Sequence, residues 1–105
     1  MTLEEIKSIP LHQTRGVYWD SKDDLETKAY LMECVHRLWG GDFGTVPEED
    51  TKANLEELEA GEGRILARYN KACKLEDDIY IICYFSATMG GLDYNNTTIM
   101  YVNEY

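Results

Sequence analysis

The chain has 105 residues, of which 44% are hydrophobic and 11% aromatic, and it carries a formal net charge of -10 at pH 7. This length supports one hydrophobic core and excludes two, so we expect a single domain over residues 1–105. The aromatic content argues against an acidic disordered tail, and the net charge argues against binding to nucleic-acid phosphates or anionic lipids. Any partner should therefore be basic.

The N-terminal stretch begins with a short predicted helix at residues 3–8, which Pro10 interrupts. It has neither a basic segment nor a long apolar run, so the sequence predicts no secretion signal and a cytoplasmic protein. In that reducing compartment the cysteines, Cys34, Cys73 and Cys83, should remain free thiols. The following "LHQTRGVYW" reads as an extended or irregular segment with a turn near Gly16.

Apolar residues at helical spacing then predict an amphipathic helix over residues 22–39, with Ser21 as its N-cap and Gly40 as its end. The residues expected to face the core are Leu25, Ala29, Met32, Val35 and Trp39. The opposite face is rich in charged residues and should be solvated.

The stretch "PEEDTKANLEELEAGEG", residues 47–63, holds seven carboxylates and one lysine. It predicts a second helix, with Thr45 and Glu48 at capping-box spacing and Pro47 in the first turn. Acidic residues stabilise the amino end of a helix but are disfavoured toward its carboxyl end. Helix stability therefore does not explain the later carboxylates, Glu56, Glu57, Glu59 and Glu62.

Beyond Gly61 the pattern changes to that of strands. "GRILARYN" and "TTIMYVNEY" alternate, whereas "DIYIICYFSA" is apolar on both faces and should be the central strand. The short connections predict an antiparallel meander. The predicted fold is α+β, with two helices followed by a three-stranded antiparallel β-meander and the helix of residues 22–39 packed on the sheet.

Candidate catalytic groups do not form a recognised pattern. "DFG" at residues 42–44 lacks every other kinase motif, and the spacing of the cysteines and histidines fits no zinc site, so we expect no metal and no cofactor. A small hydrolase or nuclease using His12, Arg15 or His36 stays as an alternative, although a negative surface repels polyanionic substrates. We expect a protein that binds and does not catalyse.

The acidic residues are the main candidate for partner binding. Two interpretations are open: a solubilising helix face, or spaced negative charge that resembles a phosphate backbone and competes for the basic channel of a nucleic-acid-binding protein. The candidate residues are Glu48, Glu49, Asp50, Glu56, Glu57, Glu59, Glu62, Glu76, Asp77, Asp78 and Tyr94. Further tyrosines outside expected core positions, Tyr18, Tyr30 and Tyr105, are of the residue type that anchors interfaces.

Five short motifs occur in order along residues 14–105. They are Thr-Arg-Gly at 14–16, Asp-Phe-Gly at 42–44, "GEGRIL" at 61–66, Thr-Thr-Ile at 97–99 and Glu-Tyr at 104–105. Their order resembles a group of small uncharacterised proteins carried by bacterial plasmids, prophages and phages. The resemblance implies an origin on mobile elements, and in size and charge the chain is similar to anti-CRISPR proteins.

The sequence therefore leads to the expectation of a mobile-element inhibitor that acts by protein–protein binding in the cytoplasm of a bacterial host. The expected partner is a basic nucleic-acid-binding protein, such as a CRISPR effector of the Cas9 type, whose charged channels acidic side chains can occupy. Besides the hydrolase, an immunity or antitoxin-like protein that masks a basic toxin is the other alternative.

Overall fold

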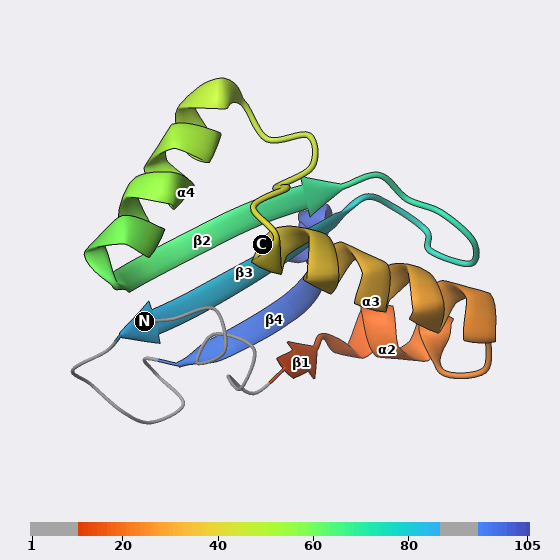
Figure 1. Ribbon diagram of the computed structural model, residues 1–105. Coiled ribbons are helices and arrows are strands. Elements are labelled where there is room, and N and C mark those ends of the chain that lie inside the picture. The colour runs from red at the N-terminus through yellow and green to blue at the C-terminus, as the bar shows by residue number, and fades with distance from the viewer. Residues whose placement is uncertain (1–10, 87–94) are drawn as a thin grey trace.

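The computed structural model describes residues 11–86 and 95–105 and shows an α+β fold built on one mixed sheet (Figure 1). The predicted helix at residues 3–8 and the candidate Tyr94 lie outside the described residues. The elements in chain order are β1 (Leu11–Gln13), α2 (Arg15–Ser21), α3 (Leu25–Trp39), α4 (Glu48–Ala60), β2 (Glu62–Tyr69), β3 (Ile79–Ser86), β4 (Asn96–Tyr101) and the 3-10 helix η1 (Val102–Glu104).

The sheet has the strand order β1-β4-β3-β2. Strands β2, β3 and β4 form the expected antiparallel meander, with the apolar β3 in the centre. The prediction of a purely three-stranded sheet is wrong, because β1 adds a fourth strand parallel to β4. All three residues of β1 are exposed, so this strand has no apolar alternation by which the sequence could reveal it.

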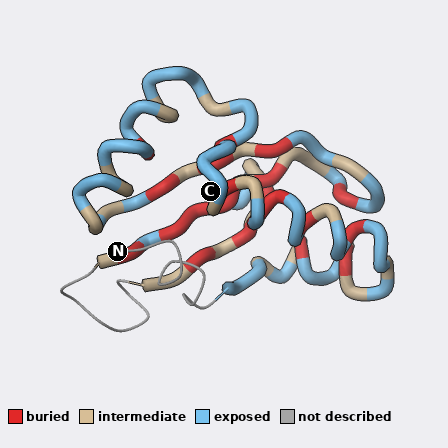
Figure 2. Tube along the Cα trace, viewed as in Figure 1, coloured by how far each residue is buried: buried red, intermediate tan, exposed pale blue. Residues whose placement is uncertain are grey.

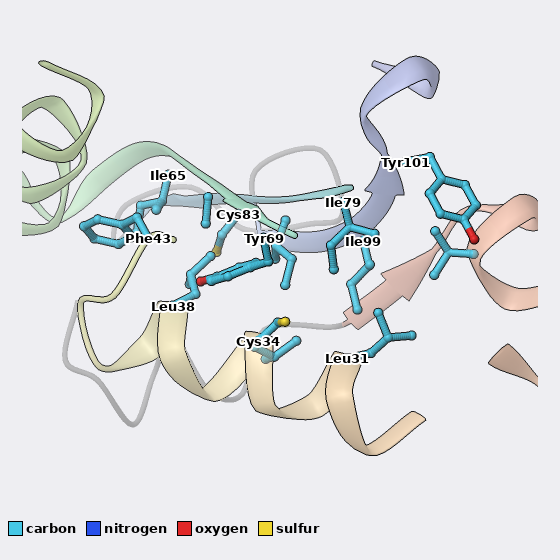
Figure 3. Packing of buried hydrophobic residues seen from close by; sticks show 14 of the residues in the cluster. Leu31, Cys34, Leu38, Phe43, Ile65, Tyr69, Ile79, Cys83, Ile99 and Tyr101 are labelled. Atoms are coloured by element: carbon cyan, nitrogen blue, oxygen red, sulfur yellow. The ribbon is translucent and has the colours of Figure 1, made fainter. Parts of the chain in front are cut away.

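The hydrophobic core lies between one face of the sheet and helices α2 and α3. Ile65, Ala67 and Tyr69 of β2 are buried on this face, and they form one of the two alternating sets of the predicted strand. Figure 2 shows the buried segments concentrated in the strands and the facing side of α3, while α4 is mostly exposed or intermediate. Figure 3 shows Leu31 and Cys34 of α3 beneath the strands.

Helix α3 packs on the sheet, and the predicted core face is partly right: Val35 is buried and Trp39 packs against the core, but Leu25, Ala29 and Met32 are exposed. Leu25 is 82% exposed and Met32 is 42% exposed. The buried residues of the helix are Thr27, Leu31, Cys34, Val35 and Leu38. The inward face includes a threonine, Thr27. The Thr27 hydroxyl donates to Asp24 at 2.5 Å and accepts from the Lys74 amide at 3.1 Å, so its burial leaves no unsatisfied polar group.

The caps of α3 also differ from the prediction. Ser21 ends α2, where its hydroxyl donates to the Val17 carbonyl at 2.8 Å. Asp24 caps α3 instead, accepting a hydrogen bond from the Thr27 amide at 3.0 Å. The sequence offered several capping residues in a row, and only the separate helix α2 decides which one is used.

The loop before α4 pairs with the free edge of β2. The Thr45 amide donates to the Arg68 carbonyl at 2.8 Å, and the Arg68 amide donates to the Phe43 carbonyl at 3.1 Å. Phe43 is buried and anchors this loop in the core. The predicted capping box of Thr45 and Glu48 does not form, since Pro47 is the N-cap and no side chain caps the helix. The Thr45 hydroxyl donates to Arg68 instead.

Asn54 attaches α4 to the same edge. Its side-chain amide donates to the Leu66 carbonyl at 2.8 Å, and its side-chain oxygen accepts from the Leu66 amide at 3.1 Å. The edge strand thus gains partners for both backbone groups of Leu66. The two bonds place α4 beside the sheet edge with its opposite side facing solvent (Figure 1).

Candidate functional site

The exposed side of α4 is the main candidate surface. It carries the carboxylates of Glu48, Glu49, Glu56 and Glu59, all exposed, and we call these residues together with Leu55 the acidic face. At about 1.5 Å of rise per residue, its carboxylates extend over about 16 Å of helix. Leu55 is 51% exposed among them, although sequence reasoning did not single it out.

Internal ion pairs do not use these charges. The ion pairs within residues 11–86 and 95–105 join Lys22 to Asp23, Arg37 to Asp42, and Arg68 to Asp78. Lys52 is exposed on the same face, four residues from both Glu48 and Glu56, so one positive charge accompanies the four carboxylates and the face keeps a net negative charge. The acidic face therefore presents negative charge that remains available for an external partner.

Three other candidate carboxylates from residues 47–63 do not belong to the acidic face. Asp50 and Glu57 are half-buried and line a small cavity of about 120 Å³ against Arg64 of β2. A Cβ atom on Gly63 would come within 1.5 Å of the Glu57 carboxylate, so glycine makes room for this side chain. Glu62 begins β2, and its carboxylate accepts a hydrogen bond from the Ser86 hydroxyl at 3.4 Å.

The second acidic group, Glu76 to Asp78, lies in the connection from β2 to β3, at the end of the sheet away from α4 (Figure 1). Asp78 is engaged inside the protein, since it accepts from Arg68 at 3.0 Å and from the Lys71 amide at 2.9 Å. These hydrogen bonds lower the pKa of Asp78. Asp77 accepts from the Asp78 amide at 2.8 Å, so Asp77 and Asp78 stabilise their own loop.

The described tyrosines have separate environments. Tyr18 is 56% exposed, whereas Tyr30 packs against the core and donates to the Asn70 carbonyl. Tyr105 is 66% exposed, accepts from the Arg64 guanidinium at 2.6 Å, and contacts the Tyr80 ring edge-on. Its position is on the sheet face opposite the core, because Arg64 and Tyr80 alternate with buried residues.

Neither of the cavities described within residues 11–86 and 95–105 brings the residues of the alternative hydrolase together. His12 lies in β1, and His36 stacks on Trp39 with ring centroids 5.3 Å apart. Arg15 begins α2 and lines a cavity in which neither histidine takes part. Across the described residues no cluster of His, Cys, Asp and Glu has the arrangement of a metal site.

The cavity that Arg15 lines joins four parts of the chain. It measures about 600 Å³, and its walls come from α2, the loop before β3, the end of β4 and η1. The lining residues are Arg15, Gly16, Trp19, Asp20, Glu76, Tyr101, Asn103 and Glu104. The sequence does not reveal this site, because it predicts an irregular segment where α2 lies and because the acidic residues of the cavity, Asp20, Glu76 and Glu104, are separated by up to 84 positions.

Tyr101 forms the base of this cavity. Its hydroxyl donates to the Asp20 carboxylate and accepts from the Glu76 amide at 3.1 Å, which joins α2, the loop and β4. Burial, together with the hydrogen bond to Asp20, raises the pKa of Tyr101 to about 12. Figure 3 shows Tyr101 at one end of the core beside α2. The phenol is therefore a neutral structural group at physiological pH.

Comparisons of the chain with protein-family models, curated proteins and solved structures give no match. None of the helices within residues 11–86 and 95–105 is long and apolar enough to cross a lipid bilayer. The functional argument therefore rests on the surface and the cavity described above.

Proposed function

We propose that this protein is a mobile-element inhibitor that binds a basic nucleic-acid-binding protein in the bacterial cytoplasm, in the manner of an anti-CRISPR protein. The observation that supports it most is the acidic face of α4, whose exposed carboxylates take no part in the ion pairs of the described residues. A helix held at the sheet edge by Asn54 offers these charges on a rigid support.

Charge on this face favours rapid association with a positively charged channel. Opposite fields steer the two proteins together, and carboxylates spaced along one helix take the positions that phosphates occupy in the channel of a Cas9-type effector. The exposed Leu55 supplies an apolar contact within the charged surface, as the central residues of interfaces do. Such a protein inhibits by occupying the channel and needs no catalytic group.

The test compares two charge-matched double variants against purified Cas9-type effector. Glu56→Gln/Glu59→Gln removes two charges from the acidic face, and Glu26→Gln/Glu33→Gln removes two exposed charges from α3. We expect the association rate constant of the α4 variant to fall at least about tenfold and its inhibition to weaken. The association rate and inhibition of the α3 variant should stay near those of the wild type. Wild-type association should slow with added salt, because salt screens exposed charges.

Equal inhibition by both variants, with no effect of salt on association, would contradict the proposal and leave the acidity as a solubilising feature. Thermal unfolding of each variant provides the fold control. Glutamine has nearly the size and helix propensity of glutamate, so the unfolding midpoints should stay close to that of the wild type.

A further inference from the structure

The cavity between α2, η1 and the loop before β3 is large enough to admit an amino-acid side chain. Its volume of about 600 Å³ lies within the range of small-molecule sites in proteins. Tyr101, hydrogen-bonded to Asp20 and to the Glu76 amide, holds its base in place. Glu104 links η1 to the start of α2 by accepting from the Thr14 hydroxyl at 2.8 Å. These bonds connect α2, the loop before β3, the end of β4 and η1.

An exposed indole lies at the rim of this cavity. Trp19 is 66% exposed, which is unusual for the largest aromatic side chain and leaves much of its ring surface available. The Lys22 ammonium group lies 4.8 Å from the centroid of the ring and is held by Asp23 at 2.9 Å. Lys22 is not among the residues that line the cavity. The ring thus already attracts one cation.

The cavity walls carry acceptors that the described residues leave unused. Asp20 and Glu104 each use one carboxylate oxygen in hydrogen bonds within residues 11–86 and 95–105, and the second oxygen has no partner there. The Glu76 carboxylate has no hydrogen bond or ion pair in the same residues. Arg15 is the basic residue of the lining, so the three carboxylates and one guanidinium give the lining a net charge of -2.

An aromatic ring beside unpaired carboxylates is the environment that a guanidinium group prefers. The guanidinium is planar, stacks on indole, and donates several hydrogen bonds in a fork that matches carboxylate oxygens. An anion would meet the net negative lining, and a metal ion would need a ligand cluster that the described residues do not form.

We propose that this cavity binds the side chain of an arginine on a basic protein partner. The existence of such a partner rests on the proposed function, but the cavity is a second contact site, separate from the acidic face of α4. Trp19 stacks on the guanidinium, Glu76 pairs with it, and the free oxygens of Asp20 and Glu104 accept its remaining N–H groups.

The experiment titrates the isotope-labelled full chain with N-acetyl-arginine N-methylamide and follows amide and indole NMR signals. We expect saturable shifts at the Trp19 indole and at the amides of Glu76 and Glu104. The matching citrulline compound has nearly the same shape without the charge, and it should cause no comparable shift.

Two variants and two controls then test the assigned residues. Trp19→Leu and Glu76→Gln should each raise the dissociation constant for blocked arginine about fivefold or more, as expected from losing a cation–π or charged contact. The controls Tyr18→Leu and Glu33→Gln change exposed residues outside the cavity and should leave it unchanged. The spectra of the free variants report whether each is folded.

The proposal is overturned if blocked citrulline binds as well as blocked arginine, if the shifts centre on α4, or if neither variant weakens binding. Because the probe is a small molecule, this result does not depend on the effector. A chain that binds blocked arginine but fails to inhibit the effector would refute the proposed function and leave the cavity assignment standing.

Discussion

At the scale of single residues, Gly44 lies where the backbone leaves no room for a side chain. Its φ of +73° favours glycine, and a Cβ atom there would lie 1.9 Å from the Arg68 carbonyl oxygen. Gly41 has a similar φ of +87° with nothing within 4 Å of a Cβ atom, so it is a matched control.

We expect Gly41→Ala to lower the free energy of unfolding by about 1–2 kcal/mol, the cost of a left-handed alanine. Gly44→Ala should cost at least about 2 kcal/mol more, because the clash also breaks the backbone bonds between residues 43–45 and Arg68. Urea unfolding of the two variants measures the difference. Equal losses would show that the close approach at Gly44 is not needed.

At the scale of elements, the N-cap of α3 makes helix stability depend on pH. The hydrogen bonds from Thr27 lower the pKa of Asp24 in the folded protein below its usual value. A lowered folded-state pKa means that the cap stabilises the protein above the unfolded-state pKa of about 3.9. This contribution is lost as the pH falls from about 5 through the folded-state pKa.

Asp24→Asn keeps a capping oxygen but removes the titration. We expect its unfolding midpoint in urea to stay near that of the wild type at pH 7 and to fall less steeply than the wild type below about pH 5. Asp24→Ala, which has no cap, should be less stable at both pH values. An acid dependence as steep in Asp24→Asn as in the wild type would assign the effect to other carboxylates.

At the scale of the whole molecule, the distribution of cysteines reports on cooperative folding. Cys34 and Cys83 are buried in the core and Cys73 is exposed, and all three are free thiols in the structure. Burial raises the pKa of both Cys34 and Cys83, which disfavours the reactive thiolate.

We expect a thiol reagent such as Ellman's reagent to label Cys73 rapidly in the native protein, and Cys34 and Cys83 only after unfolding. Cys73→Ser should abolish the rapid phase without changing the labelling in denaturant. Rapid labelling of all three thiols under native conditions would mean that the core between α3 and the sheet opens readily.

The sequence by itself determined the meander and the overall charge. Strands β2, β3 and β4 follow alternations and apolar runs that are visible in the sequence, and one alternating set of β2, Ile65, Ala67 and Tyr69, is buried. The end of α4 at Gly61, where φ is +79°, follows from a local preference of glycine. These features depend on neighbouring residues, so the linear order is enough to reveal them.

Only the tertiary structure decided which face of α3 is buried, that β1 joins the sheet, and which carboxylates are free. Asp78 is occupied by Arg68, ten positions away, whereas the acidic face of α4 remains unpaired in the described residues. The cavity depends on contacts such as that of Thr14 with Glu104, 90 positions apart. Long-range contacts of this kind leave no periodic signal, because they depend on how the elements pack and not on the order of neighbouring residues.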